Sequence, residues 1–195
     1  MAYDIKNVFY LDTELTLATA TGPGKSDTVE LDLSAYIDPI ARGRSMGTGL
    51  AIYKVHYSIS GTSEGFTPPN TADSGIIRAG LIAGAGLGTQ ATATLTGTAN
   101  SVTANNALAV FGFDYYFPDA FVGITAAPGP AGPLNRTFLE PSKDVPYICV
   151  RDNVCAVSTA LIAVQTPSYI SFRLECAQIK LDQATLNQLL RTQTV

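Results

Sequence analysis

Alternating apolar and polar side chains recur along most of this chain. The pattern is clear in residues 9–17, where one parity carries Phe9, Leu11, Leu15 and Leu17. Because successive side chains of a strand point to opposite faces, this period of two predicts a strand with one buried face. Residues 29–33 and 50–60 alternate in the same way. We expect the first two of these strands to form a hairpin across the turn-forming residues 21–25.

Further strands are predicted towards the C-terminus. Residues 76–83 are apolar on both faces apart from Arg78, which favours the middle of a sheet or a subunit contact. Residues 107–117 are the most aromatic segment and predict the heaviest strand of the core. Residues 147–164 predict a hairpin or one long strand. In the last strand, residues 169–181, the apolar parity switches near Cys176, which predicts a β-bulge there.

Between these strands lie segments that proline, glycine or small residues interrupt. Residues 61–74 read as a loop. Residues 118–146 hold six of the chain's 11 prolines, so most of this segment is expected to be irregular, and a long ordered loop often lies at an interface. Residues 89–103 are nearly all Ala, Thr, Gly and Ser, and they predict either a thin exposed strand or a loop.

A single helix is expected, at the C-terminus. Asp182 is a suitable N-cap for a short helix over residues 182–191, in which Leu186, Leu189 and Leu190 share one stripe. This stripe packs either beneath the sheet or on a neighbouring molecule. The three leucines are therefore candidates for a subunit contact.

Composition indicates one domain whose surface is largely covered by partners. The 195 residues are enough for one full core, so we expect a single domain over residues 1–195. Charged residues make up only 14% of the chain while 46% are hydrophobic, a balance that favours association with other copies. The net charge of -4 argues against strong direct nucleic-acid binding. No apolar run is long enough for a membrane span and no leader pattern is present, so we expect neither.

The cysteines do not have zinc-ligand spacing. Cys149, Cys155 and Cys176 are best interpreted as small buried hydrophobes. An alternative remains for the first two: if residues 151–153 form a three-residue hairpin loop, Cys149 lies directly opposite Cys155. A cross-strand disulfide would then form in an oxidising setting, whereas a two-residue turn would remove that option.

The polar residues offer little catalytic chemistry. Residues 22–26 read Gly-Pro-Gly-Lys-Ser, but a phosphate-binding loop also needs glycine at position 19, which is Thr19, and a following helix. The only histidine, His56, lies within a strand, so we expect neither an enzyme nor a bound cofactor or metal. Metal binding by carboxylates alone stays open, because Asp12 with Glu14 and Glu30 with Asp32 each share a strand face, but solvated outward positions on a sheet edge are the favoured interpretation. The glycine-flanked Arg42 and Arg44 are candidates for holding an anion or a neighbouring subunit, or they lie in a solvated loop.

These patterns predict an all-β protein: an antiparallel jelly-roll sandwich of about eight strands, with long Pro/Gly-rich loops and a short C-terminal helix. Val55, Tyr57, Phe111, Phe113 and Phe172 are its expected core. In strand spacing, richness in Gly, Ala, Thr and Ser, and loops such as 61–74 and 118–146, the chain resembles a single jelly-roll coat protein of a small icosahedral virus. One departure is that the basic N-terminal arm common in such proteins is missing.

The resemblance implies a structural subunit of a virion that assembles with copies of itself into an icosahedral shell. Other coat subunits or an internal membrane would then account for the missing basic arm. Two alternatives stay open. The first is a trimeric jelly-roll module of a fibre or spike that binds a receptor or carbohydrate, and the second is a pilus or surface-layer subunit.

Overall fold

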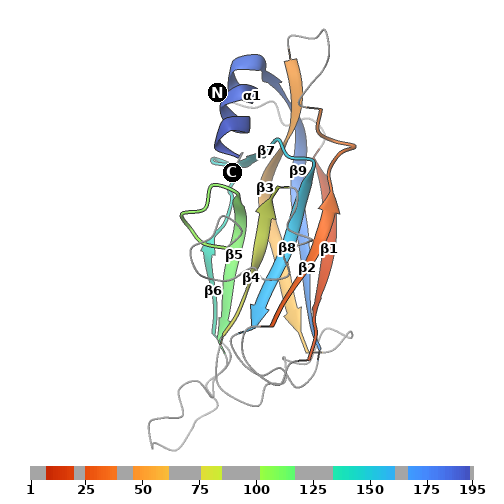
Figure 1. Ribbon diagram of the computed structural model, residues 1–195, viewed down its shortest axis with the longest axis vertical. Coiled ribbons are helices and arrows are strands. Elements are labelled where there is room, and N and C mark those ends of the chain that lie inside the picture. The colour runs from red at the N-terminus through yellow and green to blue at the C-terminus, as the bar shows by residue number, and fades with distance from the viewer. Residues whose placement is uncertain are drawn as a thin grey trace, which may run out of the picture.

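The computed structural model describes residues 8–19, 25–38, 46–61, 76–84, 102–116, 134–160 and 167–193. Within them the chain forms two antiparallel sheets and one helix (Figure 1). The four-stranded sheet contains, in spatial order, β1 (Phe9–Leu17), β9 (Ser168–Asp182), β3 (Met46–Ser60) and β7 (Tyr147–Cys149). The five-stranded sheet contains β2 (Lys25–Asp32), β8 (Asn153–Ala160), β4 (Ile76–Ala83), β5 (Ala109–Tyr116) and β6 (Leu134–Leu139).

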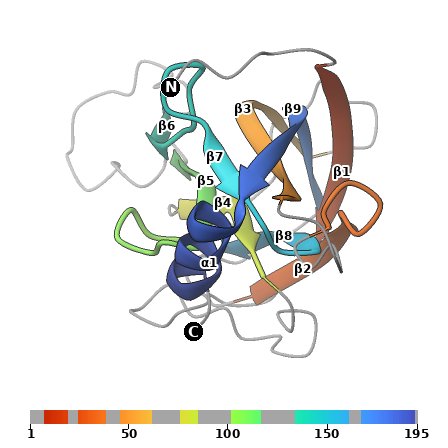
Figure 2. The same cartoon turned by 90° about the horizontal axis from the view of Figure 1, so that it is seen from above.

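The strand order is that of a jelly roll. With β6 set aside as an additional edge strand, the chain changes sheet after every strand except between β4 and β5, and the orders are β1-β9-β3-β7 and β2-β8-β4-β5. The two sheets face each other across a shared core, as the view from above shows (Figure 2). The fold class expected from the sequence is therefore confirmed.

Aromatic side chains hold the two sheets together. Phe111 and Phe113 of β5 point between the sheets, where they meet Tyr57 of β3 and Phe172 of β9. The rings of Tyr57 and Phe113 stack with centroids 4.2 Å apart, and those of Phe111 and Phe172 meet edge-on at 6.1 Å. Val55 is also buried. The predicted core is thus the observed one, because alternation correctly identified the inward parity of β3, β5 and β9.

The expected hairpin of the first two strands is wrong. β1 pairs with β9 and β2 pairs with β8, so the chain passes from one sheet to the other between them. The same crossing separates the strands of the expected 147–164 element. β7 pairs with β3 in the four-stranded sheet, whereas β8 lies between β2 and β4 in the other. A jelly roll requires these crossings, because each sheet takes its strands from distant parts of the chain.

Two further features add to the expectations from the sequence. β6 is a short strand within the proline-rich segment 118–146, of which residues 118–133 lie outside the described residues. The bulge expected near Cys176 is in the neighbouring strand, because the register of β3 against β9 shifts between Ile52 and Lys54. β9 stays regular there, and its apolar parity switches because Ala177, Ile179 and Leu181 are buried in a second cluster.

That second cluster forms beneath the helix α1 (Gln183–Thr192). The Asp182 carboxylate caps the helix by accepting a hydrogen bond from the Thr185 backbone N–H at 2.7 Å, which lowers the pKa of Asp182. Leu186 is fully buried, with Leu189 and Leu190 packed against the same cluster. At the helix end, the Gln193 side chain donates to the Ile148 carbonyl at 2.7 Å. Of the two packing arrangements considered, the one on the protein's own sheet is observed.

Candidate functional site

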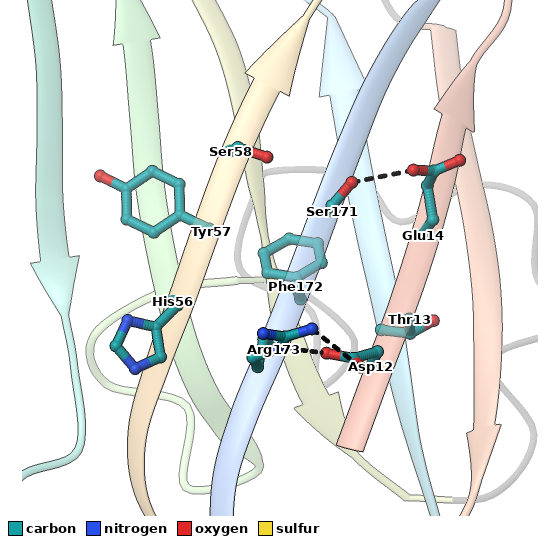
Figure 3. Close-up of a pocket in the computed structure, with 9 residues that line it drawn as sticks. All are labelled: Asp12, Thr13, Glu14, His56, Tyr57, Ser58, Ser171, Phe172 and Arg173. Carbon is teal, nitrogen blue, oxygen red and sulfur yellow. Dashed lines mark hydrogen bonds and ion pairs between the residues drawn. The ribbon is translucent and has the colours of Figure 1, made fainter. Parts of the chain in front are cut away.

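The outer face of the four-stranded sheet carries two polar rows that cross β1, β9 and β3. The register places Asp12 opposite Arg173 and Arg173 opposite His56. The next outward-facing row places Glu14 opposite Ser171 and Ser171 opposite Ser58. Alternation explains this arrangement, since each residue has the parity opposite to the core residues of its strand. The rows line a shallow depression of about 680 Å³ (Figure 3).

An ion pair joins β1 to β9 in the first row. Arg173 Nε lies 2.6 Å from Asp12 Oδ1, and Arg173 Nη2 lies 3.3 Å from Asp12 Oδ2. The hydrogen bond from Arg173 lowers the pKa of Asp12, and the same bond raises the pKa of Arg173. The guanidinium also lies 5.8 Å from the ring centroid of the exposed Tyr10. Both partners of the ion pair are well exposed, so it orients the two side chains more than it stabilises the fold.

The second row does not assemble a catalytic triad. Ser171 Oγ donates to Glu14 Oε2 at 2.9 Å. The residue that the register places opposite Ser171 on β3 is Ser58, while His56 lies in the row of Arg173. A general base for Ser171 would have to contact its hydroxyl, and Figure 3 shows His56 pointing away from it. Among the described residues, no group of three or more His, Cys, Asp or Glu side chains is arranged to hold a metal ion.

A third polar row crosses the outer face of the other, five-stranded sheet. Arg78 of β4 makes a two-point ion pair with Asp114 of β5, at 2.6 and 2.9 Å, and its guanidinium lies 5.0 Å from the ring centroid of Phe138. Asp114 is only 4% exposed. The hydrogen bond to Asp114 raises the pKa of Arg78. This pair links β4 to β5, and we interpret it as part of the framework because a buried charge needs its partner.

Comparison with known proteins adds a likeness of fold. The chain resembles viral VP1 proteins. The VP1 pentamer of human polyomavirus 7 is 12% identical, with a TM-score of 0.39, over 93% of this chain and 99% of that one. VP1 of human polyomavirus 12, in complex with 3'-sialyllactosamine, is 10% identical, with a TM-score of 0.38, over 90% of this chain and 100% of that one.

The unassembled VP1 pentamer of Washington University polyomavirus gives 8% identity and a TM-score of 0.38, over 93% of this chain and 97% of that one. These likenesses concern general architecture and assign no residue of this chain a role. No protein-family model matches the sequence, and no relative was found among curated proteins.

Cys149 and Cys155, for which the sequence left a disulfide open if residues 151–153 formed a hairpin loop, are not cross-strand neighbours. Cys149 ends β7 in the four-stranded sheet and faces the shared core. Cys155 lies in β8 of the other sheet and packs in an outer cluster with Ile82 and Val157. Residues 150–152 thus cross between the sheets rather than forming a hairpin loop, and all three cysteines are free and buried. Burial raises the pKa of Cys149 and Cys176 to about 12 and that of Cys155 to about 11.

Other candidates from the sequence have different outcomes. Arg42 and Arg44 lie outside the described residues, as do Gly22 and most of residues 89–103. Leu186 is wrong as a subunit contact because its side chain is completely buried within its own molecule. Leu189 and Leu190 are partly buried, so a role for them in subunit contacts stays a proposal. No helix among the described segments has the length and apolar character needed to span a membrane.

Sequence reasoning missed the polar rows as units. It identified Asp12 and Glu14 as sharing a face, but their partners Arg173 and Ser171 lie about 160 residues further along the chain. The available signal was that residues 171, 173 and 175 are polar between apolar residues in the last strand. That signal identifies an outward face without saying which strand lies beside it.

Proposed function

We propose that this protein is a non-catalytic structural subunit, a viral coat protein that associates with copies of itself into a closed shell. The observation that supports this most is the filled interior. A jelly roll that holds a ligand between its sheets needs space or polar groups there, but here that space contains the side chains of Phe111, Phe113 and Phe172. With only 14% charged residues, the outer surface is suited to repeated contacts with other subunits.

The proposed partners are copies of the chain, together with other coat subunits where the shell contains more than one type. A net charge of -4 leaves neutralisation of a packaged genome to another component, such as a basic protein or an internal membrane. The proposed location is therefore the virion. Assembly would proceed by mass action on many weak contacts.

The test is negative-stain electron microscopy of the purified protein together with light scattering, over a series of protein concentrations and ionic strengths. We expect closed particles of uniform size in at least one condition, in equilibrium with small oligomers. A discrete monomer or trimer under every condition would contradict self-sufficient assembly.

A receptor- or carbohydrate-binding module is the second candidate. The exposed Tyr10 lies beside the Asp12–Arg173 pair at the polar face, and an aromatic ring next to hydrogen-bonding groups is an arrangement that suits a sugar. This candidate predicts saturable binding in a glycan screen that Tyr10→Ala abolishes, in a protein that remains a small oligomer. Closed particles without such binding would favour the coat subunit.

A further inference from the structure

One side of the sandwich is acidic. β1 and β2 are edge strands of their sheets, and they lie beside each other (Figure 1). Their exposed carboxylates, which we call the acidic edge, are those of Asp12, Glu14, Glu30 and Asp32. The basic residue of these two strands is Lys25, at the start of β2. This side of the molecule therefore has an excess of negative charge.

The opposite side of the sandwich carries basic side chains. β6 lies on the far side of the molecule from β1 and β2 (Figure 2), and the Tyr57 hydroxyl of β3 is 3.0 Å from Thr137 Oγ1 of β6. The exposed ionisable side chains of β3 and β6, which we call the basic edge, are those of Lys54, His56 and Arg136. Neither strand contains Asp or Glu. Both sheets therefore change from acidic to basic in the same direction across the molecule.

Most of these charges have no counter-charge within the molecule. Of the two edges, only Asp12 takes part in an ion pair between described residues, with Arg173. The other carboxylates of the acidic edge accept hydrogen bonds from uncharged groups, and Lys54 and Arg136 have no acidic partner among the described residues. Charge of either sign prevents a sheet edge from accepting another strand. Edge protection therefore does not explain why the two signs lie on opposite sides.

We propose that the acidic edge of one copy of this chain binds the basic edge of the next copy. Opposite charges attract across such a contact, whereas two acidic edges or two basic edges repel each other. Because each copy presents both edges on opposite sides, the contact is head-to-tail and repeats from copy to copy. Contacts of this kind form a ring when the rotation between neighbours closes.

This inference rests on the proposed function, because it names one of the contacts that such a subunit would use. The contact is confined to the strands, since the connection between β6 and β7 carries both signs, with Glu140 and Asp144 exposed on either side of Lys143 in the sequence. Ion pairs between exposed side chains are individually weak and are screened by salt, with a Debye length of about 8 Å at physiological ionic strength. We therefore expect association that weakens as salt is added.

The test reverses the sign of each edge in the full chain. The acidic-edge reversal is Glu14→Lys with Glu30→Lys, and the basic-edge reversal is Lys54→Glu with Arg136→Glu. These four side chains are exposed, so the fold should survive. We expect either reversal alone to weaken association roughly tenfold or more in sedimentation velocity at low salt, because like charges then meet.

The combination of both reversals in one chain is the decisive variant. It exchanges the signs of the two edges and leaves the net charge at -4, so association should return to the wild-type level. Neither a loss of folding nor a change in net charge could produce that recovery. The matched control is Lys180→Glu with Arg191→Glu, which changes the net charge as much as the basic-edge reversal but near α1, and it should associate like the wild type.

The two proposals fail in different ways. If the combined chain associates no better than the single reversals, or if salt strengthens association, the contact between the edges is wrong. If closed particles form equally well from the wild type and from each single reversal, the shell function stands without this contact. If the wild type forms rings or open chains that respond to the reversals but never closed particles, the contact is right and the shell function is wrong. A wild type that stays monomeric at every concentration contradicts both.

Discussion

At the scale of single residues, the aromatic core gives the most direct test of the fold. Phe172 of β9 contacts Phe111 and Phe113 of β5, so it joins the two sheets at their centre. We expect Phe172→Ala to lower the free energy of unfolding by about 3–5 kcal/mol, the usual cost of removing a buried aromatic ring. Urea denaturation followed by circular dichroism measures this loss.

The matched control is Tyr10→Ala, because Tyr10 lies on the same pair of strands with 57% of its surface exposed. We expect a change within about 1 kcal/mol there. Equal losses for the two variants would show that Phe172 does not lie between the sheets.

The buried cysteines give a second prediction at this scale. Burial raises the pKa of all three thiols, to about 12 for Cys149 and Cys176 and about 11 for Cys155, so very little reactive thiolate exists at pH 8. We expect a thiol reagent to react slowly with the native protein. After denaturation in urea, all three thiols of the chain should react. An added thiol in Ser58→Cys, on the exposed outer face, should react at once. Rapid labelling of the native wild type would contradict the described packing.

At the scale of elements, α1 is the clearest case of an element whose role depends on what it covers. The sequence predicted its cap and its leucine stripe but left open whether the stripe contacts its own sheet or a neighbour. The structure buries Leu186 against Ala177, Ile179 and Leu181 of β9. The hydrophobic stripe alone could not distinguish these cases, because both surfaces are apolar.

This packing predicts a stability effect rather than an assembly effect. We expect Leu186→Ala to lower the free energy of unfolding by about 2–5 kcal/mol. Gln188→Ala, on the exposed side of the same helix, should change it by less than about 0.5 kcal/mol. Thermal unfolding measures both. If Leu186→Ala instead left stability unchanged and abolished association, the helix would be a subunit contact after all.

The strands β6 and β7 show where element prediction from sequence fails. β6 lies within the proline-rich segment, whose composition argued against regular structure over most of its length and did not indicate a strand. β7 and β8 looked like one hairpin because residues 151–153 are turn-forming, but the three residues between them cross from one sheet to the other. A turn signal indicates that the chain changes direction, and it does not say whether the next strand joins the same sheet.

At the scale of the whole molecule, pairing between the ends of the chain dominates the topology. β1 and β3 both take their main partner from β9, near the C-terminus. We therefore expect a chain that ends at residue 167 to leave β1 and β3 without amide protection, even though their own residues are intact. Hydrogen exchange measures this, and a chain that ends at Gln193 is the control. Protected β1 amides in the shorter chain would contradict the observed pairing.

What the sequence by itself determined is the position of most strands, the inward face of those that alternate, the aromatic core and the capped terminal helix. These features depend on alternation, bulk and capping, which are local properties of neighbouring residues. Sequence reasoning therefore reached the jelly-roll class and named Val55, Tyr57 and Phe172 as core residues before their neighbours were known.

Only the tertiary structure decided which strands lie side by side. The pairing of β1 with β9, the polar row that joins Asp12 to Arg173 and the separation of Cys149 from Cys155 all follow from that decision. The physical reason is that backbone hydrogen bonds, which join strands, are the same for nearly every residue. An alternating strand can therefore pair with any other, until packing of the whole core selects one arrangement.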